Sequence, residues 1–178
     1  MSRNPDGDQE QSVRFADLPV PALAALEQGD LELAEARAGL RLGEHFVSDR
    51  ARWLWRVRLN QIVEDPDNTH WMTRVLATDP ADTVLGHGGF HGPPDAQGMV
   101  EVGYFVVPEH RRRGVARAML RELVRRAEAA QDARIVRACI SPRNAPSLAT
   151  IAGFGFAKVG EQWDDEDGLE IIHELRLT

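Results

Sequence analysis

The feature that most constrains this chain is segment 100–120, in which an apolar run passes through a basic loop into an amphipathic pattern. The run VEVGYFVV is rich in β-branched and aromatic residues, and it predicts a buried strand over 99–107. Apolar residues then recur at helical spacing, which predicts a helix from about Gly114 to Gln131. A further strand is expected at 134–140. Strand, helix and strand in this order predict a parallel pair with a right-handed crossover.

The rest of the chain supplies helices first and strands afterwards. Helical spacing marks the first third, with Asp30 and Ser48 as N-caps of two of its helices. Period-two patterns and turn residues predict the remaining strands, at 13–15, 71–77, 83–90, 156–163 and 169–177, with a short helix at 145–152. We therefore predict an α/β fold in a single domain over 12–178, with a mixed, mostly antiparallel sheet and a central parallel pair flanked by helices. Residues 1–11 are polar and are predicted to form a flexible tail.

Composition narrows the class of partner. The chain has 178 residues, 28 of them acidic and 21 basic, and its net charge of −7 argues against nucleic acid as the main partner. A single cysteine excludes an internal disulfide framework and a cysteine zinc cluster. No apolar run approaches the ~20 residues of a membrane span, and the first residues lack the apolar centre of a secretory signal. We expect no membrane partner and a cytoplasmic location.

The basic loop predicts an anion site. Gly114 at the helix start lets a ligand approach the backbone, where the first amides of a helix have no internal acceptors. The positive end of the helix dipole and Arg111, Arg112 and Arg113 favour an anion, and a diphosphate fits this geometry best. The Walker pattern and the dinucleotide fingerprint are both absent. The alternative is a helix start with an exposed arginine cluster.

Two motifs in this chain resemble those of the GNAT superfamily of acyl-CoA-dependent N-acyltransferases. The family pattern [R/Q]-x-x-G-x-[G/A] occurs as Arg111-Arg-Arg-Gly114-Val-Ala116, and SPRNAPSLATIAGFGF at 141–156 resembles the second family block. The resemblance covers residues 70–178 and is strongest to the branch that contains ribosomal-protein N-terminal acetyltransferases. It implies a GNAT-like fold and N-acetylation of a small amine or of a protein or peptide amine.

The resemblance also implies a set of site residues. The co-substrate would be acetyl-CoA, with no metal, held by Phe105, Val106, Val107, Arg111, Arg112, Arg113, Gly114, Val115, Ala116, Asn144 and Ser147. The amides at Val106 and Val107 would polarise the thioester carbonyl. In this family, pairing through the sheet edge or the C-terminal strands is common, which leaves a homodimer open.

The expected reaction is direct attack of a primary amine on the thioester in a ternary complex. An alkyl ammonium with a pKa of ~10.4 must first lose a proton, so a base is useful. The resemblance and the apolar strand around it favour Glu101 for that role, with His87 and His91 in reserve. Ser147 could donate a proton to the leaving thiol or bond its sulfur. The chain departs from the family at Ile151, where many members carry Tyr, and at Arg112, where relatives often carry Gly.

Several alternatives remain open at this level. Glu101 could be a strand residue in a salt bridge, and Ser147 could belong only to the first turn of a helix capped by Asn144. The acidic run at 164–167 could line the acceptor site or simply face water. Trp53, Trp55 and Trp163 could line the acceptor site or pack in the core. Cys139 lies in an apolar strand and is expected to pack in the core. Whole-protein alternatives are a CoA-binding or ligand-sequestering protein without efficient turnover, and a structural domain that binds an unrelated phosphate.

Overall fold

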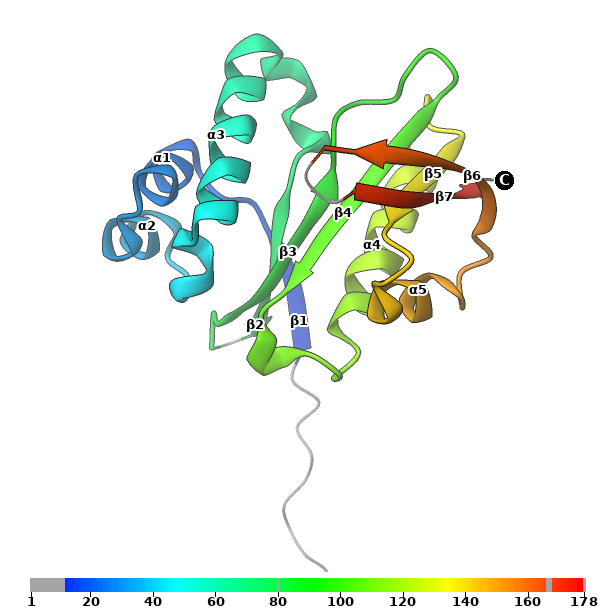
Figure 1. The fold of residues 1–178 in the computed structure, drawn as a ribbon. Coiled ribbons are helices and arrows are strands. Elements are labelled where there is room, and N and C mark those ends of the chain that lie inside the picture. The colour runs from blue at the N-terminus through cyan, green and yellow to red at the C-terminus, as the bar shows by residue number, and fades with distance from the viewer. Residues whose placement is uncertain (1–11, 80, 166–167, 178) are drawn as a thin grey trace, which may run out of the picture.

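The computed structural model describes residues 12–79, 81–165 and 168–177. A seven-stranded sheet runs through the molecule in the order β1-β2-β3-β4-β5-β7-β6 (Figure 1). Its strands are β1 (Ser12–Ala16), β2 (Arg74–Asp79), β3 (Val84–Phe90), β4 (Met99–Val106), β5 (Ile135–Ile140), β6 (Ala157–Asp164) and β7 (Gly168–Arg176). The helices are α1 (Val20–Gln28), α2 (Leu31–Ala38), α3 (Asp49–Glu64), α4 (Val115–Ala129) and α5 (Ala145–Ile151), with short 3-10 turns η1 (Glu44–Val47), η2 (Pro66–Trp71) and η3 (Pro108–His110).

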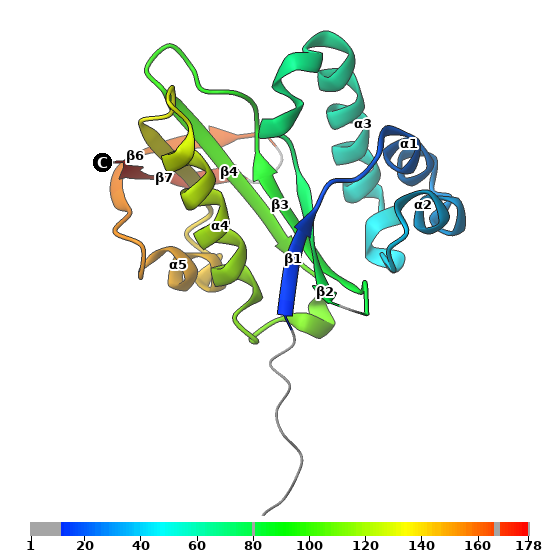
Figure 2. The same cartoon turned by 180° about the vertical axis from the view of Figure 1, so that it is seen from behind.

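This arrangement confirms the predicted fold class. Neighbouring strands are antiparallel except for β4 and β5, which are joined by the crossover helix α4. Helices α1, α2 and α3 lie on one side of the sheet and α4 on the other (Figures 1 and 2). The predicted tail at 1–11 lies outside the described residues. Within the part of the chain that the structure describes, no helix has the length and apolar character needed to cross a bilayer.

One strand begins later than its sequence pattern predicts. The expected strand at 71–77 starts only at Arg74, because Trp71 ends the turn η2, which Pro66 opens. Trp71 is 3% exposed and packs edge-to-face on Phe90, with ring centroids 5.0 Å apart. Its aromatic character therefore reflects core packing at the end of the sheet and not a place in the strand.

Strand β4 divides its side chains between the two sides of the sheet. Val100 and Val102 are buried in the cluster that contains Leu120 and Leu123 of α4. Since successive side chains of a strand point to opposite faces, the odd-numbered residues of β4 face α1 and α3, and Phe105 packs against the core on that side. The alternation therefore places Glu101 on the face opposite to α4.

The parallel pair β4–β5 is joined only at its start. The two strands pair at Met99↔Ile135, Val100↔Val136 and Glu101↔Arg137. Beyond these positions β4 stays paired with β3 and β5 with β7. The sheet therefore opens into two halves after Glu101, and the loops that follow β4 and β5 lie at its open end.

Candidate functional site

The loop before α4 has the backbone geometry of an anion site. Arg112 and Gly114 have positive φ values of 60° and 78°, and Gly114 is the N-cap of α4 without any side-chain cap. A Cβ placed on Gly114 would meet nothing within 4 Å, so the helix start is open to solvent. Left-handed residues just before a helix direct successive amides outward into a concavity that suits an oxyanion. The left-handed conformation at Arg112 is also one that Gly adopts more easily, which accounts for the Gly of relatives.

The three arginines of this loop are not equivalent. The Arg111 Nε donates a hydrogen bond to the Val106 carbonyl at 3.0 Å, and its guanidinium carbon lies 5.7 Å from the centroid of the Phe105 ring. Arg111 therefore ties the loop back to the end of β4. Arg112 and Arg113 are exposed beside the helix start, where their charges are available to a ligand.

The second sequence motif forms the start of α5, which follows β5 at the same open end. The Asn144 side chain caps this helix by accepting a hydrogen bond from the Ser147 amide at 3.1 Å. The capping interpretation of Asn144 is thus confirmed, whereas contact with a cofactor stays a prediction. Ile151 is 3% exposed in the core, so its position offers no acid. The guanidinium carbon of Arg117 in α4 lies 5.6 Å from the centroid of the Phe154 ring, which ties α4 to the turn after α5.

Backbone groups of β4 face the gap between the half-sheets. The Val107 amide donates to the Leu85 carbonyl at 2.9 Å, so it is already engaged with β3. Since hydrogen-bonding sides alternate along an antiparallel pair, the backbone groups of Val106 point the other way. Of the two amides expected to polarise a carbonyl, the Val106 amide is the one directed at the gap.

Glu101 lies in a cluster of polar side chains on the face toward α3. Its Oε1 is 3.4 Å from Nδ1 of His91, and its side chain is 24% exposed. The Cys139 thiol hydrogen-bonds the same carboxylate, and burial together with that charge raises the pKa of Cys139 to about 12. This thiol is protonated at neutral pH, which disfavours an acyl-cysteine intermediate. Beside it, Arg137 pairs with Glu174 at 2.6 Å.

The two histidines of β3 and its end have different surroundings. The side chain of His91 is half-exposed, and the neighbours that cover its other side partly desolvate the ring. This desolvation and the charge of Arg58 lower its pKa, while Glu101 and Glu170 oppose the shift. His87 is stacked on Phe105, with Trp55 and Phe46 edge-on. Burial and the charge of Arg58 lower the pKa of His87 to about 4. His87, one of the two reserve candidates for the base, thus lies within an aromatic cluster.

Sequence reasoning missed Arg58. It is 6% exposed and its Nη1 donates to Gln61 at 2.7 Å and to the His91 carbonyl at 3.2 Å. The signal was present in the sequence, because Arg58 lies three residues after buried Trp55 and four before Ile62 on the inner stripe of α3. An arginine within the apolar stripe of a helix indicates a buried guanidinium.

The remaining acceptor clues are mixed. Trp55 is fully buried and belongs to the core, whereas Trp53 is 50% and Trp163 76% exposed. The predicted acidic run ends on Glu166 and Asp167, which lie outside the described residues. Within 12–79, 81–165 and 168–177, no group of three or more His, Cys, Asp or Glu side chains could hold a metal ion.

A protein-family model matches most of the chain, and solved structures share its fold. The family model described as "Acetyltransferase (GNAT) family" matches residues 33–156. No curated protein sequence matches this chain significantly.

Solved structures agree with the chain over nearly its whole length. Ribosomal-protein-S5-alanine acetyltransferase from Vibrio fischeri superposes with a TM-score of 0.63 at 18% identity, covering 92% of this chain and 91% of that one. Mycobacterium smegmatis RimJ, solved with CoA-disulfide, has a TM-score of 0.65 at 16% identity and coverages of 92% and 81%. For yncA of Salmonella typhimurium, solved with its cofactor acetyl-CoA, the TM-score is 0.60 at 20% identity, and both coverages are 94%.

Proposed function

This chain belongs to the acetyltransferase (GNAT) family, and we propose that it transfers an acetyl group from acetyl-CoA to a primary amine in a ternary complex. The observation that carries the proposal is the open helix start at Gly114, placed where β4 and β5 separate. A diphosphate at that helix start leaves the attached arm next to the gap between the two half-sheets. Residues 12–178 would act as one catalytic domain.

The loop Arg111–Ala116 would hold the co-substrate mainly through backbone. The amides of Val115 and Ala116 would donate to the diphosphate, and the dipole of the 15-residue helix α4 favours its charge. Arg112 and Arg113 would add charge from the rim, while Arg111 keeps the loop docked on Val106. Asn144 and Ser147, at the start of α5, would bound the other side of the gap.

Glu101 would act as the base on the side of the sheet away from α4. Its carboxylate would take a proton from the ammonium form of the acceptor, leaving the lone pair on nitrogen free to attack the thioester carbon. His91, 3.4 Å away, would accept this proton and pass it to solvent, since partial desolvation lowers its pKa and favours the neutral ring.

Two further groups would assist bond cleavage. The Val106 amide would donate to the carbonyl oxygen as negative charge develops there, a contribution that fixed donors supply efficiently. The C–N bond forms, the C–S bond breaks and the thiolate leaves with Ser147 hydrogen-bonded to its sulfur, and the thiolate takes up the second proton released by the attacking nitrogen. A thiol with a pKa of ~8.5 leaves easily, so a strong acid at Ile151 is not needed.

The decisive experiment measures release of free thiol from acetyl-CoA against a panel of alkyl amines, polyamines and peptides with free N-termini. We expect amine-dependent thiol release with saturation in both substrates and intersecting initial-rate patterns. Saturable acetyl-CoA binding without thiol release for any amine would favour the CoA-binding alternative, for which the buried Ile151 in place of an acid is the specific support. Absence of acetyl-CoA binding would refute the family function for this chain.

A further inference from the structure

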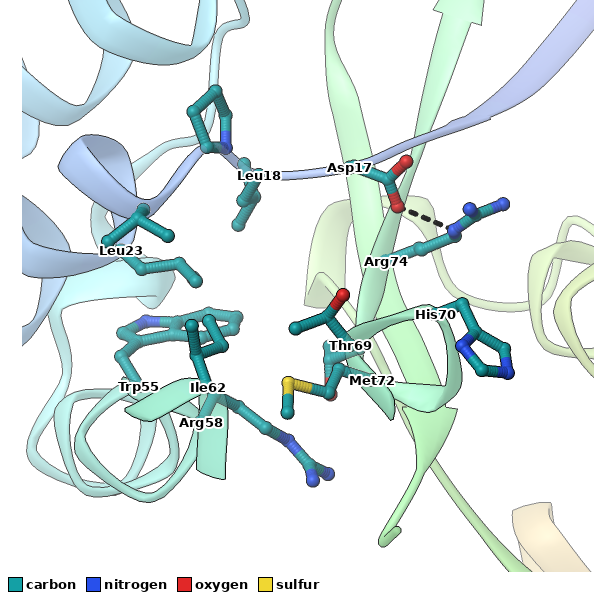
Figure 3. Close-up of a pocket in the computed structure, with 13 residues that line it drawn as sticks. Asp17, Leu18, Leu23, Trp55, Arg58, Ile62, Thr69, His70, Met72 and Arg74 are labelled. Atoms are coloured by element: carbon teal, nitrogen blue, oxygen red, sulfur yellow. Dashed lines mark ion pairs between the residues drawn. The ribbon is translucent and has the colours of Figure 1, made fainter. Parts of the chain in front are cut away.

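A cavity of about 400 Å³ lies between α3 and the turn η2, and Figure 3 shows the residues that line it. Its walls come from the link between β1 and α1, from α1 and α3, and from the turn η2 with the start of β2. Cavities that bind small molecules measure roughly 300–1,000 Å³, so this one is large enough for a compact ligand. Its apolar lining includes Leu18, Leu23, Trp55, Ile62 and Met72.

Arg58 is the exceptional group in this lining. It is 6% exposed, its Nε has no hydrogen-bond acceptor, and no carboxylate of the described residues forms an ion pair with it. Burial lowers the pKa of its guanidinium to about 10, which still leaves it charged at neutral pH. A buried charge without a counter-ion destabilises the folded protein, and an anion that reaches it would offset that cost.

The other charged groups of the lining are already balanced. Asp17 and Arg74 form an ion pair at 2.5 Å, marked by the dashed line in Figure 3. Neither offers an unpaired charge to a ligand. In the same view Leu18, Leu23 and Ile62 lie across the cavity from Thr69 and Met72, and Arg58 extends from the side of α3. The cavity thus offers an apolar body with a single uncompensated cation among its described residues.

We propose that this cavity is a binding site for a small amphiphilic carboxylate, with its hydrocarbon body between α3 and η2 and its carboxylate on the Arg58 guanidinium. Nη1 of Arg58 already donates to Gln61 and to the His91 carbonyl, and Nε is shielded from solvent, so the carboxylate would meet the guanidinium at its remaining donor, Nη2. The ligand is distinct from acetyl-CoA, which carries no carboxylate, and unlike the acceptor of the proposed reaction it needs no amino group.

The probe is octanoate, with 1-octanol as the matched molecule that lacks the charge. Calorimetric titration of the full chain should show saturable binding of one octanoate. Binding of 1-octanol should be at least tenfold weaker, since the alcohol lacks the negative charge that pairs with the guanidinium. In NMR spectra the indole signal of Trp55 should shift on titration, while that of exposed Trp163 should stay fixed.

Two variants test the site from different sides. Arg58→Gln should weaken octanoate at least tenfold and leave 1-octanol unchanged. Ile62→Trp fills the cavity from α3 and should weaken both probes, while acetyl-CoA affinity stays that of the parent. If Arg58→Gln does not fold, Ile62→Trp and the comparison of the two probes still test whether octanoate binds in this cavity through its charge. Equal affinity of octanoate and 1-octanol, non-saturable binding, or unchanged octanoate binding by Ile62→Trp would overturn the proposal.

Discussion

The loop before α4 and the cluster around Glu101 are built in opposite ways. The loop consists of consecutive residues, Arg111–Ala116, and presents mainly backbone with two left-handed residues. The cluster assembles side chains from five segments: Arg58 and Gln61 of α3, His91, Glu101 of β4, Cys139 of β5 and Glu170 of β7. A site made by consecutive backbone can be recognised in a sequence, whereas one made by distant side chains emerges only from the fold.

The largest expected effect concerns the loop. Gly114→Glu should weaken acetyl-CoA binding by about 1,000-fold, because it places a carboxylate in the anion site and a Cβ on a residue with φ of 78°. Isothermal titration of acetyl-CoA measures this. Gly39→Glu is the matched control, since Gly39 also has a positive φ of 65° and open space around it. Equal loss of affinity in both variants would show that backbone strain, not the loop, is responsible.

A smaller effect is expected within the cluster. Glu101→Gln should lower kcat by about 100-fold, the range for a lost general base, while the KM for acetyl-CoA changes less than twofold. Steady-state kinetics with the best amine of the panel measures this. Glu174→Gln on β7 is the control, because its carboxylate is paired with Arg137 and should leave kcat within threefold of the parent. A kcat unaffected by Glu101→Gln would exclude Glu101 as the base.

The aromatic cluster beside Glu101 should make stability depend on pH. The unfolded chain protonates His87 near pH 6.5, whereas the folded chain does so only near pH 4. Stability present above pH 6.5 should therefore be lost as the pH falls toward 4, by roughly 2–3 kcal/mol. Urea unfolding at several pH values measures this loss. His87→Phe keeps a ring among the aromatics and should abolish most of it; an unchanged pH dependence would contradict the assignment.

The smallest effect should fall on the start of α5. Ser147→Ala should lower kcat by about threefold to tenfold, because a thiolate leaves readily and needs little help. Its capping contact is made by the backbone amide of Ser147, so the variant should keep the stability of the parent. Asn144→Ala is the contrasting variant, expected to cost about 1 kcal/mol of stability through loss of the N-cap. A change in kcat greater than 100-fold for Ser147→Ala would assign it a larger catalytic part.

The sequence predicted the elements well because their signals are local. Period, caps and turn residues mark most of the chain, and Asp30 and Ser48 cap the helices predicted for them. The strand predicted at 71–77 starts only at Arg74, because Trp71 is typical of strands in composition but packs in a turn against Phe90. Local composition cannot separate a buried turn from a strand without knowledge of its neighbour.

The candidate site was predictable only in part. The anion site at Gly114 can be predicted from the residues of its loop alone, and the apolar run at 99–107 predicts that Glu101 lies on a strand. The partners of Glu101 could not be predicted, because His91 and Cys139 meet it through the pairing of three strands. Nor does composition reveal that Val107 donates its amide to Leu85 while Val106 does not. That difference arises from which edge of the strand faces its neighbour.

Because the pairing between β4 and β5 ends early, the centre of this sheet contains strand edges without a neighbouring strand, as its two outer edges do. Beyond Glu101 each of these two strands is paired with a neighbouring strand along one edge only, like β1 and β6 at the outer edges of the sheet. Bare strand sides exchange their amide hydrogens quickly and invite pairing with foreign strands. A long molecule threaded between them would therefore act as a temporary strand, slowing exchange at Val106 and protecting the protein from self-association.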